Sequence, residues 1–194
     1  MKNLPFCIEK FSYIVSEEQI DVSFISPLVR RKLSLLDKAA LTTMFKVFEL
    51  QNVEEIVFSS EYGEFTRLDN LIKQYQEFGE TSPAVFSTSV HNYPVSFFTL
   101  YNKLNLPYCA LSAGKSSLGA GLVKSLQKQT LFTYADIYDG VKSVSCIISP
   151  NKSGLEFSGG SYENESFENF IAFLKEDKKE FLTEFGKFFM CNIC

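Results

Sequence analysis

The residues that could do chemistry gather in one turn, Gly114-Lys115-Ser116-Ser117. The apolar run before it, Tyr108 to Leu111, is typical of a strand, and the small-residue segment after it has helical spacing. A turn between a strand and a helix can cradle a phosphate on its backbone N–H groups. It can also present a nucleophile at the positive end of the helix dipole. These two kinds of chemistry require different residues.

A phosphate-binding loop follows the pattern G-x-x-x-x-G-K-[ST], and Gly114-Lys115-Ser116 matches only its end. Cys109 stands where the first glycine belongs, and the four residues that follow it are mainly apolar and fit a strand. Asp136, at the end of a later apolar run, imitates the magnesium-side motif of nucleotide-binding proteins. A nucleotide-binding protein stays open as an alternative, although the incomplete motif predicts no specific binding of ATP or GTP.

A hydroxyl nucleophile is a second possibility at this turn. Ser116 or Ser117 would attack and His91, the one histidine in the chain, would act as the base of an acyltransferase or hydrolase. Against this interpretation, no second base partner is visible. One of the serines can instead cap the helix, and a single histidine beside an apolar helix is more typical of a structural residue.

The five cysteines do not form a complete disulfide framework. Cys7, Cys109 and Cys146 lie in apolar β-like runs, where free cysteine behaves as a small buried apolar residue. Cys191 and Cys194 have CxxC spacing but no second ligand pair. We therefore expect no metal site and no cofactor, and the role of the CxxC pair stays open.

Composition favours one globular domain that spans residues 1–194. The chain is 45% hydrophobic with 20 phenylalanines, enough to fill a core. A net charge of -4 with scattered lysines and arginines argues against nucleic acid as a partner. No apolar run approaches the roughly 18 residues of a membrane span, so we expect a cytoplasmic protein.

Periodicity predicts alternating strands and helices. The expected strands cover 6–15, 54–60, 108–112, 131–138 and 141–149, with a small one at 155–157. The expected helices cover 33–50, 64–78, 92–104, 117–127 and about 166–189. Asp139-Gly140 is a tight-turn signal, which makes the strand at 141–149 antiparallel to its predecessor.

Two of the expected helices carry long apolar stripes. In the helix at 64–78, apolar residues recur along one face and Gly79 supplies the stop. In the helix at 166–189, Ser166 is the expected cap, and phenylalanines recur at helical spacing from Phe170 to Phe188. This last helix is predicted to cover the sheet, with a partner surface as the alternative.

Four segments together resemble a known family: "SPLVRRKLSLLDKAAL", "VFSSEYGEF", "SPAVFSTSVHN" and "LSAGKSSLGAGL". In order and spacing they are similar to the N-terminal half of the β-ketoacyl synthases and chain-length-factor-like proteins of the thiolase superfamily. The resemblance runs from about Phe6 to Ser149. It implies an α/β, thiolase-like half with a five-stranded mixed sheet layered with helices. Independently, the element order and the Asp139-Gly140 turn predict that the strand at 108–112 lies inside the sheet.

The resemblance also implies that the condensing site is incomplete. In active synthases the turn reads like T-A-C-S-S-S-L, which places Gly114 where the nucleophilic cysteine belongs. The family also uses two histidines, or a histidine and an asparagine, to stabilise the enolate, and this chain has only His91. His91, Asn92, Gly114, Lys115 and Ser116 remain candidate binding residues.

The expected function is therefore that of a non-condensing, accessory homologue of the synthases. The resemblance implies a fatty-acid or polyketide-type pathway similar to aryl polyene or flexirubin synthesis. A full-length β-ketoacyl synthase, an acyl carrier protein or both would be its partners. Half of a thiolase fold leaves a face to be covered, so a homo-oligomer or a hetero-oligomer is open.

Overall fold

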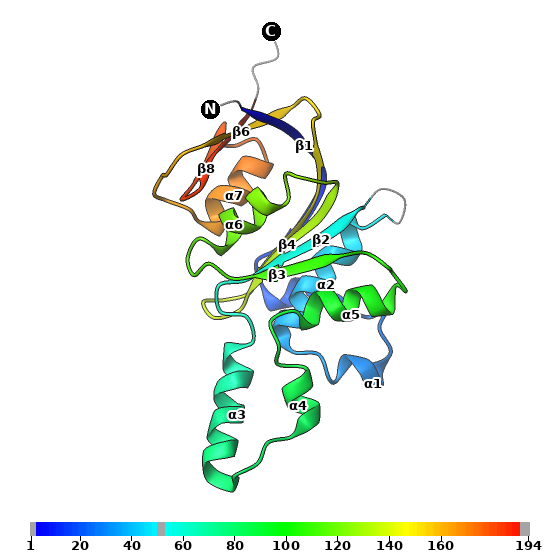
Figure 1. Cartoon of the computed structure of the whole chain (residues 1–194). Coiled ribbons are helices and arrows are strands. Elements are labelled where there is room, and N and C mark those ends of the chain that lie inside the picture. Colours follow the sequence, from blue (N-terminus) through cyan, green and yellow to red (C-terminus); the bar gives the residue numbers. More distant parts are fainter. Residues whose placement is uncertain (1–2, 50–52, 191–194) are drawn as a thin grey trace.

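A mixed eight-stranded sheet runs through the protein in the order β3-β2-β4-β5-β1-β6-β8-β7 (Figure 1). The computed structural model describes residues 3–49 and 53–190, so Cys191 and Cys194 lie outside the described residues. The strands are β1 (Leu4–Ile14), β2 (Glu55–Ser59), β3 (Tyr108–Leu111), β4 (Thr130–Asp136), β5 (Lys142–Pro150), β6 (Leu155–Gly159), β7 (Glu180–Thr183) and β8 (Gly186–Met190). The helices are η1 (Glu17–Gln19), α1 (Pro27–Arg30), α2 (Leu35–Val47), α3 (Phe65–Phe78), α4 (Pro83–Ser87), α5 (Tyr93–Tyr101), α6 (Ser117–Lys124) and α7 (Phe167–Leu174).

Strand directions confirm the predicted hairpin. β3, β2 and β4 are parallel, whereas β5 pairs antiparallel with β4 across the turn at Asp139-Gly140. β1 then pairs antiparallel with β5 on one side and with β6 on the other. The sheet is mixed as expected, but β6, β8 and β7 extend it from the predicted five strands to eight.

The predicted position of β3 is wrong: this strand lies at the edge of the sheet and not inside it. β3 pairs only with β2, through the register Ile56–Tyr108 to Ser59–Leu111. Its four residues are half-buried or exposed, with Tyr108 41% exposed. A run of four apolar residues indicates a strand, but its composition does not reveal whether neighbours pair on one side or on both.

The C-terminal helix expected at about 166–189 is also wrong beyond its first two turns. Ser166 does cap α7, since its Oγ accepts a hydrogen bond from the Asn169 backbone N–H at 3.1 Å. The helix then stops at Leu174, and Glu176 adopts a left-handed φ of 65° in the following turn. The remaining phenylalanines belong to the antiparallel hairpin of β7 and β8.

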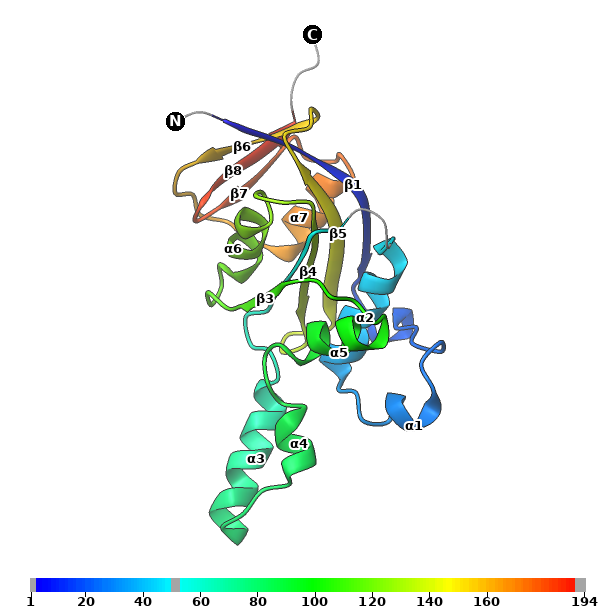
Figure 2. The ribbon, with the colours of Figure 1, turned by 45° about the vertical axis from the view of Figure 1, so that its right-hand side comes forward.

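Helices cover both faces of the sheet, as Figures 1 and 2 show. α2 and α5 pack on one face, against side chains such as Ile56 and Phe58 of β2. α6 and α7 pack on the other face, where Val57 of the same strand belongs to a cluster with the C-terminal phenylalanines. This alternation along β2 follows from the two-residue period of a strand.

α3 and α4 extend away from this layered body (Figures 1 and 2). α3 begins one residue after the predicted start and ends as predicted, where Gly79 adopts the left-handed conformation, with φ 75° and its N–H donated to the Tyr75 carbonyl. Of its fourteen residues only Leu71 is buried. The two helices together form an arm in the connection between β2 and β3.

Candidate functional site

The turn from β3 into α6, called the elbow here, is a sharp strand-to-helix connection that passes through Gly114. Gly114 lies in this turn with a left-handed φ of 57° and is exposed. A Cβ atom added to Gly114 would meet no atom within 4 Å. A side chain at this position would therefore project into open space, yet glycine supplies none.

The two serines of the turn are engaged by the chain itself. Ser117 is buried, and its Oγ accepts a hydrogen bond from Ala113 N–H at 2.9 Å and donates one to the Gly114 carbonyl at 2.6 Å. Ser116 is the N-cap residue of α6, but its side chain makes no cap bond; its Oγ donates instead to the Glu184 carboxylate. Ser117 therefore stabilises the turn by its hydrogen bonds. Neither the Ser116 nor the Ser117 hydroxyl is hydrogen-bonded to His91.

His91 and Asn92 contact β3. The Nε2 atom of His91 lies 2.9 Å from the Leu111 carbonyl oxygen, and its ring lies 5.6 Å from that of Phe58. Because a carbonyl oxygen only accepts hydrogen bonds, Nε2 must carry the proton. Asn92 Nδ2 is 3.5 Å from the Tyr108 hydroxyl oxygen. Both predicted binding residues thus hold the edge strand in this structure.

A carboxylate from the C-terminal segment occupies the N-terminus of α6. Glu165 Oε1 accepts a hydrogen bond from the Gly119 backbone N–H at 2.8 Å. The Ser116 and Ser117 N–H groups are bonded to the carbonyls of Ala113 and Gly114. Burial raises the pKa of Glu165 to about 7, against the opposing effect of its hydrogen bond from Gly119. The chain therefore places its own carboxyl group at the helix end where a phosphate would bind.

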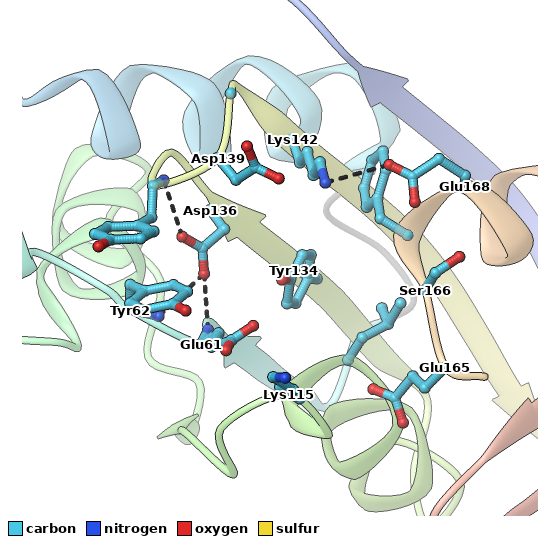
Figure 3. A pocket seen from close by; sticks show the side chains of 14 residues that line it. Glu61, Tyr62, Lys115, Tyr134, Asp136, Asp139, Lys142, Glu165, Ser166 and Glu168 are labelled. Atoms are coloured by element: carbon cyan, nitrogen blue, oxygen red, sulfur yellow. Dashed lines mark hydrogen bonds and ion pairs between the residues drawn. The ribbon is translucent and has the colours of Figure 1, made fainter. Parts of the chain in front are cut away.

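A cavity of about 490 Å³ opens beside the elbow, and Figure 3 shows its side chains. It lies where β2 and β4 end, between the β4–β5 hairpin and the start of α7. Its lining residues are Glu61, Tyr62, Lys115, Leu118, Tyr134, Asp136, Tyr138, Asp139, Gly140, Lys142, Glu165, Ser166, Phe167 and Glu168. Parallel strands commonly place ligand sites at their carboxyl ends.

Of the predicted binding residues, Lys115 lines this cavity. A neighbouring hollow of about 410 Å³ is lined in part by Lys115 and Ser116 together with Glu184. Sequence reasoning missed Lys142 and Glu168, which form an ion pair of 3.2 Å, and also Tyr134, whose pKa is raised by burial. Two sequence features could have indicated these cavity residues. They are the polar residues that end β4 and the Asp-Gly turn beside them.

Asp136 joins two segments of the cavity wall through hydrogen bonds to its carboxylate. Its Oδ2 accepts hydrogen bonds from Ser60 Oγ and from the N–H groups of Glu61 and Tyr62, at 2.8 to 3.1 Å. Its Oδ1 accepts from the N–H groups that follow it, at positions 137 and 138. With five donors from its own chain, this carboxylate joins the end of β2 to the β4–β5 hairpin.

Within residues 3–49 and 53–190, no three histidine, cysteine or acidic side chains are placed to hold a metal ion together. In the same ranges, no helix is both long enough and apolar enough to cross a membrane.

The comparison with protein families decides the relationship of this chain. Residues 9–131 match the model of the β-ketoacyl synthase N-terminal domain. The chain belongs to this family. This membership confirms the relationship that the four sequence segments indicated, and it covers the elbow and the whole arm.

A solved structure supports the same relationship at the level of the fold. The chain superposes with a TM-score of 0.80 on a chain of the ketosynthase (ApeO) in complex with its chain length factor (ApeC) from Xenorhabdus doucetiae. The two are 19% identical, and the match covers 97% of this chain and 100% of the other. No curated protein sequence is similar enough to count as a match. The fold is therefore thiolase-like, with the three C-terminal strands included in the likeness.

Proposed function

We propose that this protein is a non-condensing accessory member of the β-ketoacyl synthase family that binds a complete synthase, an acyl carrier protein or both. The observation that carries the proposal is Gly114, which keeps the left-handed backbone of an elbow and leaves the nucleophile position open and empty of a side chain. Covalent catalysis needs a thiolate or another nucleophile at that point. A fatty-acid or polyketide-type pathway of the aryl polyene or flexirubin kind is the proposed setting.

The surroundings of the elbow support the same proposal. Decarboxylative condensation needs preorganised donors that stabilise an enolate oxygen. His91 is the one histidine of the chain, and its Nε2 proton is directed to the Leu111 carbonyl. The Gly119 N–H, in the first turn of α6, donates to Glu165. A thiol placed at the elbow would therefore lack the electrostatic stabilisation that the reaction requires.

The two alternative functions receive less support from this geometry. For an acyltransferase or hydrolase, a serine must be within hydrogen-bonding reach of its base, whereas Ser116 donates to Glu184 and Ser117 to Gly114. For a nucleotide-binding protein, N–H groups at the start of α6 must be available, whereas Glu165 accepts from Gly119. We therefore retain binding, and not catalysis, as the proposed role.

A product assay tests the proposal. The purified chain and its Gly114→Cys variant are each incubated with malonyl-loaded and acyl-loaded carrier protein, alone and with a full-length β-ketoacyl synthase from the same organism. We expect no condensation by either form alone, because a restored thiol still lacks enolate-stabilising histidines. We also expect the wild-type chain to co-purify with the synthase or with the carrier protein.

An active synthase assayed with the same substrates is the positive control. Condensation by the isolated wild-type chain would show that it is an independent enzyme. Failure to co-purify with either partner would remove the binding half of the proposal.

A further inference from the structure

We propose that the cavity beside the elbow binds a linear aliphatic diamine, an assignment that goes beyond the proposed function and does not depend on it. Two lysines and five carboxyl groups line this cavity: Lys115 and Lys142, and Glu61, Asp136, Asp139, Glu165 and Glu168. Acidic side chains are therefore in excess. A ligand that complements such a lining carries positive charge.

Tyr134 presents to the cavity a hydroxyl group that the chain leaves without a partner. The residue is 8% exposed, and it lines the cavity from β4. Figure 3 shows its ring in the midst of the polar lining side chains. Within residues 3–49 and 53–190, its hydroxyl group makes no hydrogen bond. Buried polar groups are normally hydrogen-bonded, so a ligand with N–H groups that enters the cavity can supply the missing partner.

Negative charge acts on the tyrosines of this cavity. Burial raises the pKa of Tyr134, and the charges of Asp136 and Glu61 are among those that raise it further. The pKa of Tyr62, at the rim, is also raised, first by the charge of Glu61. Both hydroxyl groups therefore stay protonated at neutral pH, and the oxygen of Tyr134 can accept a hydrogen bond from an ammonium group.

The lysines of the cavity do not cancel this charge. Lys142 forms an ion pair of 3.2 Å with Glu168 and so balances that carboxylate. Lys115 is the other lysine of the lining, and it is exposed to solvent. The five donors that bond to Asp136 are neutral hydroxyl and N–H groups, which leave its negative charge in place. A net negative charge therefore remains for a ligand to balance.

An organic cation fits this lining better than a metal ion. In the part of the chain that the structure describes, no set of three acidic, histidine or cysteine side chains is arranged to hold a metal. Leu118 and Phe167 also line the cavity and are 3% and 6% exposed, so part of its wall is apolar. At the rim, Tyr138 stacks on Tyr62 with ring centroids 4.1 Å apart, and aromatic faces attract organic ammonium groups.

The placement of the carboxyl groups matches two separated charges on the ligand. In the view of Figure 3, Glu61 and Asp136 lie on one side of Tyr134, and Glu165 lies on the other. An ammonium group at each end of a short methylene chain can approach both sides, while the methylene groups contact the apolar part of the wall. A monoamine would leave one of the two acidic sides without a partner.

Isothermal titration calorimetry of the isolated chain with putrescine, the four-carbon diamine, tests the proposal. The diol of the same chain length is the neutral control ligand. Tyr134→Phe removes only a hydroxyl group and Glu61→Gln removes only a charge. Glu77→Gln, near the C-terminal end of α3 and away from the cavity, is the matched charge control.

We expect putrescine to bind the wild type with a Kd of about 1 mM or tighter, and the diol not to bind. Tyr134→Phe and Glu61→Gln should each weaken binding about tenfold, because each loses one interaction with a charged ligand. Glu77→Gln should bind like the wild type. Circular dichroism shows whether each variant keeps the wild-type fold, and if Tyr134→Phe does not, the partly exposed Glu61→Gln decides.

Several results would overturn the inference. Absence of putrescine binding to the wild type, or equal binding of the diol, would show that the cavity does not select a diamine. Wild-type affinity in folded Tyr134→Phe or in Glu61→Gln would place the ligand elsewhere. An equal loss in Glu77→Gln would indicate attraction by net charge alone. These measurements use neither synthase nor carrier protein, so their failure leaves the proposed function standing.

Discussion

α6 and α3 both carry apolar residues at helical spacing, but they lie in opposite environments. α6 buries five of its eight residues between the sheet and the C-terminal segment, whereas α3 buries one of fourteen. The difference lies in what each helix meets. Small residues such as Gly119 and Gly121 let α6 approach the sheet closely, while the large apolar residues of α3 face outward. An apolar period indicates where the apolar face of a helix lies and not which molecule covers it.

The largest expected effect comes from filling the close contact of α6 with the sheet. A Cβ atom at Gly121 would lie 2.5 Å from Phe132 Cε2 and 2.6 Å from Ser59 Oγ. Gly121→Val should therefore lower the free energy of unfolding by about 3 kcal/mol through overpacking. Urea denaturation followed by circular dichroism measures the change.

Gly114→Ala is the control for this substitution. The added methyl group meets open space, so only the left-handed backbone is penalised, at about 1 kcal/mol. Equal losses for the two variants would mean that α6 does not pack as closely as the structure shows.

A smaller effect is expected from the buried carboxyl at the base of the arm. Burial, with a contribution from the nearby Glu64, raises the pKa of Asp37 to about 7. A raised carboxyl pKa means that the folded state binds more protons than the unfolded state between about pH 4 and pH 7. Stability from this group is therefore present at low pH and decreases as the pH rises through 7.

Asp37→Asn should remove this dependence while keeping an oxygen that accepts from Ser34 N–H. The stability of the variant relative to the wild type should rise by about 2 kcal/mol between pH 5 and pH 8. Thermal and urea unfolding across this range measure it, with Asp139→Asn in the exposed hairpin as control. A constant difference at all pH values would show that Asp37 is already ionised in the folded protein at pH 5.

The smallest effect is expected at Ile72 on the exposed side of α3, in contrast to its buried neighbour Leu71. Leu71 is 6% exposed, so Leu71→Ala should cost about 2 kcal/mol of folding free energy. The adjacent Ile72 is mostly exposed, and Ile72→Ala should cost less than about 0.5 kcal/mol in the isolated chain. Urea unfolding of both variants tests this contrast. A large loss for Ile72→Ala would indicate that the side chain of Ile72 is covered by the chain itself.

Much of the sheet could be predicted from local sequence signals. Asp139-Gly140 identified the hairpin between β4 and β5, and Ser166 identified the start of α7. Both signals are local, because a particular residue type suits the backbone conformation or hydrogen bonding at its own position. Gly114 belongs to the same class, because a left-handed φ in a sharp turn favours glycine.

Features that depend on distant contacts could not be predicted in this way. The spacing from Phe170 to Phe188 fits a helix, yet Glu176 turns the chain, and Phe181 and Phe188 face each other in paired strands. Helical and strand periods both allow this spacing over short stretches. The carboxylate of Glu165 at the start of α6 had no local signal, since 46 residues separate it from Gly119.

The pairing of β1 has a consequence for how the chain folds during synthesis. β1 begins at Leu4, but its partner strands β5 and β6 lie more than 120 residues further along. The ribosome must therefore release most of the chain before the first strand can be inserted between its neighbours. Such long-range pairing slows folding and leaves apolar strand surface open in the nascent chain. β1 is thus made well before its partner strands, so its apolar side chains stay unpaired in the emerging polypeptide until β5 and β6 have been synthesised.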